Sequence, residues 1–225
     1  MVDTNVHAAW HDRWENGRIG FHRQTVNEHL VRHWSVLDAP GAAAVFVPLC
    51  GKAVDLHWLA KQHDRVVGVE LSPVAVRDFF AESEVSPTQK SSGSLECWTH
   101  DNISIWCGDF FELTPEHLGK VDAFFDRASL IALPEAVRKR YQRHLATLVP
   151  AGAKGLTVTV DYPQQQMNGP PFSVGADELA QISAGLFDVS PLQTVDVLAN
   201  EDKFRERGVT SMVEQVSLLT RMAQK

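Results

Sequence analysis

The sequence AVFVPLCGKAVD, at residues 44–55, sets the fold class of this chain. It joins a short apolar run, a turn with one glycine and the beginning of an amphipathic stretch. A second apolar run, RVVGVE, follows at residues 65–70. Short apolar runs separated by helical stretches are typical of strands that are buried on both faces of a parallel sheet. Residues 44–70 therefore predict a strand-helix-strand unit.

The same alternation continues towards the C-terminus. Further strands are expected at 95–99, 103–107, 121–125, 154–161, 187–197 and 211–221, and helices at 53–62, 74–83, 134–148 and 177–186. The serine-rich residues 84–94 indicate a turn. This order predicts a doubly wound α/β fold with a mostly parallel sheet of about seven strands, and the last two strands predict an antiparallel C-terminal edge.

Residues 1–40 are polar and rich in aromatic side chains, and they predict two helices joined by a glycine-containing loop. Trp10 and Trp14 are four residues apart and therefore share one face of the first helix. The second helix is expected at about 25–37. We expect residues 1–40 to form a helical lid or extension on a main domain of residues 41–225, with one structural domain overall.

Composition restricts the partners of the chain. Its 225 residues carry 21 Lys and Arg against 28 Asp and Glu, a formal net charge of −7. An acidic surface repels phosphate backbones and anionic membranes, so neither nucleic acid nor a membrane is an expected partner. The absence of a targeting segment and the low cysteine count predict a cytoplasmic protein. His29 and His33 share a helix face, but no third ligand stands at a recognisable spacing, so no metal is expected.

Ligands of such folds bind beyond the carboxyl ends of the strands. The turn after the first strand contains Gly51, but the chain has neither a G-x-G-x-x-G fingerprint nor a P-loop, which argues against NAD and FAD. Glu70 ends the second strand, nineteen residues after Gly51. A carboxylate at this place favours a contact with ribose hydroxyls over a surface acid or a helix cap.

Two further strand ends carry charged residues. Asp109 and Phe110 follow a strand and suit an adenine, although aspartate is also a common turn residue. Arg127 follows Asp126 in an apolar surrounding, and it suits a ligand carboxylate, an anionic substrate or a structural ion pair. A carboxylate that binds ribose, in a chain without a glycine-rich motif for a pyrophosphate, indicates a nucleoside ligand whose tail lacks phosphate. S-adenosylmethionine fits this description.

Several motifs resemble those of the thiopurine S-methyltransferase family across nearly the whole chain. They are WHDRW at 10–14, IGFH at 19–22, VPLCGKA at 47–53, VGVE at 67–70, GDF at 108–110, DRA at 126–128, ALP at 132–134 and GPPFS at 169–173. The resemblance is to bacterial members of the family. It implies the class I methyltransferase fold, S-adenosylmethionine as methyl donor, and S-methylation of aromatic and heterocyclic thiols such as thiopurines.

The resemblance also implies roles for particular residues. The residues expected to contact the cofactor are Trp10, Leu49, Glu70 and Arg127, with Asp109 and Phe110 on the adenine side. Phe21 and Arg207 are expected near the substrate. In-line methyl transfer to a thiolate needs no general base, so no catalytic residue is assigned. The expected partner is a small thiol, and the chain is expected to be a monomer.

Two alternatives remain open at this point. One is a methyltransferase for halide, sulfide, selenium or tellurium anions, which would use the same cofactor site. The other is a non-catalytic S-adenosylmethionine-binding module.

Overall fold

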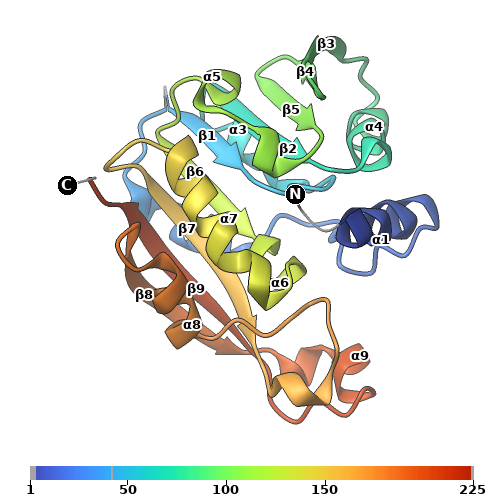
Figure 1. Cartoon of the computed structure of the whole chain (residues 1–225), viewed down its shortest axis with the longest axis vertical. Coiled ribbons are helices and arrows are strands. Elements are labelled where there is room, and N and C mark those ends of the chain that lie inside the picture. Colours follow the sequence, from blue (N-terminus) through green and yellow to red (C-terminus); the bar gives the residue numbers. More distant parts are fainter. Residues whose placement is uncertain (1–3, 42, 224–225) are drawn as a thin grey trace. The chain divides into compact units, whose positions relative to one another are not determined.

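The computed structural model describes residues 4–41 and 43–223. Its contacts divide the chain into two compact units, which we call the first and the second unit. The first unit comprises residues up to 32 together with 39–121, and the second comprises 33–38 and the residues from 122 onwards. Each unit contains strands and helices, most of which are labelled in Figure 1.

The first unit contains five strands in the order β3-β4-β5-β2-β1. They are β1 (Ala44–Val47), β2 (Arg65–Glu70), β3 (Thr88–Ser92), β4 (Leu95–His100) and β5 (Ile103–Cys107). β1, β2 and β5 run parallel, whereas β3, β4 and β5 form an antiparallel meander. The helices are α1 (Thr4–Glu15), α2 (Glu28–His33), α3 (Asp55–Ala60), α4 (Pro73–Glu82) and α5 (Pro115–Leu118), with the short 3-10 helix η2 (Phe110–Glu112).

The second unit contains four strands in the order β6-β7-β9-β8. They are β6 (Ala123–Arg127), β7 (Lys154–Asp161), β8 (Phe187–Asp196) and β9 (Val213–Arg221). β6 and β7 are parallel and β9 pairs antiparallel with both β7 and β8, which confirms the antiparallel C-terminal edge. The helices are α6 (Ser129–Ala132), α7 (Glu135–Leu148), α8 (Ala176–Ser183) and α9 (Asp202–Arg205), with the 3-10 helices η1 (Trp34–Leu37), η3 (Gln164–Gln166) and η4 (Leu198–Asn200).

Close packing in both cores depends on glycines in the strands. Every residue of β1 is buried, as its apolar sequence predicts. In β2, a Cβ atom at Gly68 would lie 2.7 Å from the Cys50 sulfur, so this strand can approach the turn after β1 only with glycine. In β7, a Cβ atom at Gly155 would lie 2.1 Å from the Phe124 ring, which occupies that space.

Two expectations need correction. The described residues contain nine strands rather than about seven, and β3 lies within the stretch that was expected to be a turn. Because four of the five β3 residues are exposed, this strand carries no apolar signal. The second helix begins at Glu28 rather than near 25, because the Asn27 side chain accepts hydrogen bonds from the amides of His29 and Leu30 at 3.0 and 3.1 Å.

No helix in the described part of the chain combines the length and the apolar content that are needed to cross a membrane.

A buried carboxyl group links β6 to α7 in the second unit. Asp126 is only 1% exposed, and its Oδ2 atom accepts a hydrogen bond of 2.9 Å from the Tyr141 hydroxyl. Burial raises the pKa of Asp126 to about 6, although hydrogen bonds from Ser129 and Tyr141 favour the charged form. The folded chain therefore holds this proton at pH values where an unfolded aspartate has lost it.

This difference predicts a pH-dependent stability. Unfolded aspartate releases its proton near pH 3.8 and folded Asp126 near pH 6, so between these values the contribution of Asp126 to stability falls as pH rises. The Asp126→Asn variant carries no such proton. Its free energy of unfolding, relative to the wild type, should therefore increase by about 2 kcal/mol from pH 4 to pH 6. Urea unfolding at several pH values measures this, with exposed Asp188→Asn as the control, and a difference that does not change with pH would contradict it.

Candidate functional site

The turn after β1 has a strained backbone. Leu49 adopts a φ of 46° and Gly51 a φ of 54°, and the Cys50 amide donates a hydrogen bond of 2.9 Å to the Val69 carbonyl at the end of β2. The left-handed conformation costs a residue with a Cβ atom about 1–2 kcal/mol. Such strain is found most often at functional sites, so the position of Leu49 agrees with a role in binding.

Glu70 joins this turn to the end of β2. Its side chain is buried, and its Oε2 atom accepts the Gly51 amide at 2.9 Å while Oε1 accepts the Ser72 amide at 2.8 Å. Burial raises the pKa of Glu70, whereas the hydrogen bonds from the Ser72, Gly51 and Leu71 amides lower it. A carboxylate has about four acceptor sites, so with these three amides bound Glu70 keeps acceptor capacity for one further donor.

The end of β5 lies beside the end of β2. The Gly108 amide donates a hydrogen bond of 2.9 Å to the Glu70 carbonyl, which places Asp109 directly after this contact. Asp109 caps η2, because its Oδ1 atom accepts the Phe111 amide at 2.9 Å. Its Oδ2 atom lies 3.8 Å from His7 Nε2 of α1. Phe110 is buried and packs edge-on against Phe111.

Aromatic residues of α1 and the following loop lie over the β1 turn. Trp14 is 5% exposed, and a Cβ atom at Gly51 would lie only 3.2 Å from its ring. The Phe21 ring is edge-on to both Trp10 and Trp14, with centroid distances of 5.5 and 5.6 Å. Phe21 itself is 38% exposed. The sequence pattern identified Trp10 and Phe21 but not the contact between Trp14 and Gly51.

The cysteines beside this site are not poised as nucleophiles. Burial and the nearby charge of Glu70 raise the pKa of Cys50 well above its ordinary value. The same two causes, in the same order, raise the pKa of Cys107 to about 11. Both thiols therefore keep their protons at neutral pH, and a thiol is a far weaker nucleophile than a thiolate.

The first unit thus brings together six of the predicted site residues, on α1, the following loop and the ends of three parallel strands. They are Trp10, Phe21, Leu49, Glu70, Asp109 and Phe110. The other two, Arg127 and Arg207, belong to the second unit.

Arg127 is the last residue of β6 and is half-buried. The next residue, Ala128, adopts a φ of 68° before α6 begins. Left-handed backbone therefore lies directly after Arg127. The turn after β1 likewise has left-handed backbone, at Leu49.

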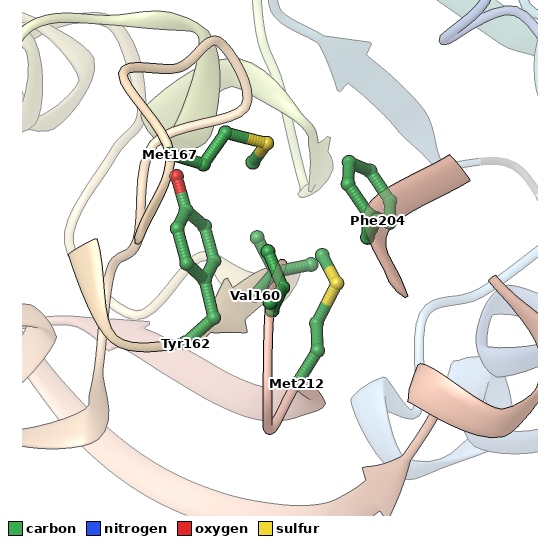
Figure 2. Close-up of a cluster of buried hydrophobic side chains, with 6 residues drawn as sticks. Val160, Tyr162, Met167, Phe204 and Met212 are labelled. Carbon is green, nitrogen blue, oxygen red and sulfur yellow. The ribbon is translucent and has the colours of Figure 1, made fainter. Parts of the chain in front are cut away.

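Arg207 follows α9 and is exposed, and its Nη1 atom lies 3.7 Å from the sulfur of Met167. Met167 belongs to a buried apolar cluster with Val160, Tyr162, Phe204, Val209 and Met212. Figure 2 shows the Met167 side chain extending into this cluster from the segment after β7. The sequence pattern did not predict that the segment after β7 contacts Arg207.

S-adenosylmethionine fits the residues of the first unit. The Glu70 carboxylate keeps acceptor capacity for a ribose hydroxyl, and the β1 turn offers one positive-φ glycine rather than the glycine-rich cradle of a pyrophosphate. Among the described residues, no group of three or more His, Cys, Asp and Glu side chains could hold a metal ion.

The chain is similar to known proteins over nearly its whole length. The profile of the family described as "Thiopurine S-methyltransferase (TPMT)" matches residues 6–222. The chain is 46% identical over 207 residues to the thiopurine S-methyltransferase of Pseudomonas fluorescens strain Pf0-1, covering 92% of this chain and 95% of that protein. It is 43% identical over 210 residues to that of Nitrosospira multiformis, covering 93% and 96%.

Solved structures of lower sequence identity share the fold. A SAM-dependent methyltransferase from Anabaena variabilis is 14% identical with a TM-score of 0.62, covering 97% of this chain and 96% of that one. The 1,6-didemethyltoxoflavin-N1-methyltransferase of Burkholderia thailandensis, solved with S-adenosylhomocysteine, is 15% identical with a TM-score of 0.62, covering 98% and 89%. At these identities the likeness shows the class I methyltransferase fold.

The match of the family profile to nearly the whole chain, together with relatives above 40% identity, leads to one conclusion: this chain belongs to the thiopurine S-methyltransferase family.

Proposed function

We propose that this chain is an S-adenosylmethionine-dependent methyltransferase that methylates the sulfur of aromatic and heterocyclic thiols such as thiopurines. Its family membership supports this proposal. The observation that carries it is the buried Glu70 carboxylate, which ends β2 beside the strained turn after β1 and retains acceptor capacity.

Residues of the first unit bind the nucleoside part of the cofactor in this proposal. Glu70 accepts a hydrogen bond from a ribose hydroxyl, and Leu49 presents the backbone of its turn. Asp109 and Phe110 stand on the adenine side, where the Oδ1 atom of Asp109 caps η2 and its Oδ2 atom faces His7 of α1. Trp10 contributes an aromatic face from α1.

The chemistry follows from these binding roles. When bound, S-adenosylmethionine supplies a methyl group on a positively charged sulfur, which a soft thiolate displaces in line. The protein supplies proximity and alignment, which can account for much of a rate enhancement in such transfers. Arg127 and Arg207 favour the anionic form of the thiol, because a nearby positive charge lowers the pKa of an acid. Their part in the reaction is a prediction from the family motifs.

The N-terminal segment, residues 1–40, is proposed as a lid on the main domain of residues 41–225. The packing of Trp14 against Gly51 and the approach of His7 to Asp109 support a covering role within the first unit. Action as a monomer in the cytoplasm stays a prediction.

Radiolabelled S-adenosylmethionine tests the proposed activity. We expect label to be transferred to 6-mercaptopurine and other heteroaromatic thiols, and transfer to selenium or tellurium oxyanions, sulfide and halides to be slower. Faster transfer to the inorganic anions would replace the proposed substrate class. Cofactor binding without transfer to any of these acceptors would indicate a non-catalytic module.

Glu70→Gln tests the ribose contact. The amide loses the negative charge that strengthens hydrogen bonds from the ribose, so the Kd of S-adenosylmethionine should rise by about 10–100-fold. Calorimetry measures this Kd, with the exposed Glu116→Gln as the control. Because Glu70 also accepts two backbone amides, the melting temperature must be recorded in parallel. An unchanged Kd in the folded variant would show that Glu70 does not bind the ribose.

Arg207→Met tests the second basic residue. The variant keeps most of the length of the side chain and removes its charge, so kcat/KM for the thiol should fall by about tenfold while the cofactor Kd stays within twofold. The exposed neighbour Arg205 provides the control, as Arg205→Met. Equal losses in thiol turnover and cofactor affinity would assign Arg207 a structural role instead.

A further inference from the structure

We propose that Arg138 and Glu178 form a positioning clamp that holds the loop of residues 169–173 and thereby sets the affinity of the enzyme for its thiol substrate. This inference rests on the proposed function. Arg138 lies on α7 and Glu178 on α8, and neither residue belongs to a motif of the predicted site. All the groups involved belong to the second unit.

The Arg138 side chain makes contacts in several directions although it is almost fully buried. Its Nη1 atom lies 2.6 and 2.8 Å from the two carboxylate oxygens of Glu178, and 3.1 Å from the carbonyl oxygen of Ser173. Its Nε atom donates to the Leu133 carbonyl at 3.0 Å. The guanidinium carbon lies 5.7 Å from the centroid of the Phe172 ring. One side chain therefore links α7, α8 and the end of the loop.

The chemistry of this contact favours arginine. The side chain of Arg138 is 3% exposed and that of Glu178 is 28% exposed, so the cation is buried and its partner reaches solvent. Removing the partner of a buried charge is costly because the remaining charge stays desolvated. A lysine ammonium cannot reproduce the planar set of donors that reaches a carboxylate and two backbone carbonyls together.

The other side of the loop is fixed to the end of β7. The Tyr162 hydroxyl donates to the Pro171 carbonyl at 2.6 Å, and the Tyr162 amide donates to the Ser173 hydroxyl at 3.0 Å. The Ser173 hydroxyl in turn donates to Asp161 at 2.8 Å, and the Phe172 amide donates to the Ile131 carbonyl at 2.7 Å. The loop is thus held between the clamp and the strand end, with little freedom to shift.

The same segment reaches Arg207. The Gln164 side chain accepts the Ser173 amide at 2.8 Å and donates to the Met167 carbonyl at 2.6 Å, which connects the loop to the residue beside the Arg207 guanidinium. Figure 2 shows Met167 and Tyr162 at the cluster into which Phe204 of α9 also projects. Movement of the loop would therefore change the surroundings of Arg207 as well.

The position of the loop points to the substrate. It follows the carboxyl end of β7, which is parallel to β6, and ligands of such folds bind at the carboxyl ends of the strands. Pro170, Pro171 and Phe172 are half-buried and offer rigid apolar surfaces that suit a flat heterocycle. A Cβ atom at Gly169, whose φ is 68°, would lie 2.5 Å from the Phe172 ring, so the loop is closely packed around that ring.

Glu178→Gln and Arg138→Lys test the clamp. Each weakens a charge-assisted contact, so the KM for 6-mercaptopurine should rise by about tenfold, whereas kcat should change less and the Kd of S-adenosylmethionine should stay within twofold. Hydrogen exchange at the amides of residues 172–174 should become faster in both variants. Exposed Asp177→Asn on α8 and Arg143→Lys on α7 are the matched controls.

The outcomes separate the clamp from the proposed function. If KM and the cofactor Kd rise together, or if the exchange rates at 172–174 stay unchanged, the clamp is not a positioning device. If Arg138→Lys fails to fold, the partly exposed Glu178→Gln and the loop variant Tyr162→Phe decide the question with the same measurements. A wild-type chain that binds the cofactor but methylates no thiol overturns the proposed function and the substrate role of the loop, whereas hydrogen exchange reports on the clamp without any turnover.

Discussion

The buried Glu70 carboxylate is the contact on which the first unit depends. It accepts backbone amides from Gly51 and Ser72, so one side chain fixes both the turn after β1 and the start of α4. The neighbouring amide of Gly108 donates to the carbonyl of the same residue, which adds the end of β5. Three segments that are distant in sequence thereby meet at one residue, and the desolvation of its charge is offset by directed hydrogen bonds.

The sequence predicts buried elements well because burial leaves a periodic signal. β7 was predicted with its observed bounds, and β1, β2 and β5 fall at the predicted apolar runs. β3 escaped detection because an edge strand with exposed residues does not need apolar side chains to pair with its neighbour. The beginning of α2 was also missed, since it depends on a capping hydrogen bond by Asn27 rather than on periodicity.

In the candidate site, too, some features could be predicted from the sequence and others could not. Glu70, Asp109 and Arg127 were identifiable because the ends of strands can be located from apolar runs. Contacts between distant segments were not identifiable, and they include Trp14 against Gly51 and Met167 beside Arg207. Arg138 shares the buried face of α7 with Tyr141, Gln142 and Leu145. It was missed because an arginine at such a position is usually solvated, and only the fold shows the carboxylate that pairs with it.

The position of β3 at an edge of the sheet also bears on aggregation. It forms one margin of the sheet in the first unit, where unpaired amides and carbonyls could recruit a strand from another molecule. The residues at this margin, Gln89, Lys90 and Ser91, are hydrophilic and solvated. An incoming chain would have to strip water from the Lys90 ammonium, so this edge discourages intermolecular β-aggregation.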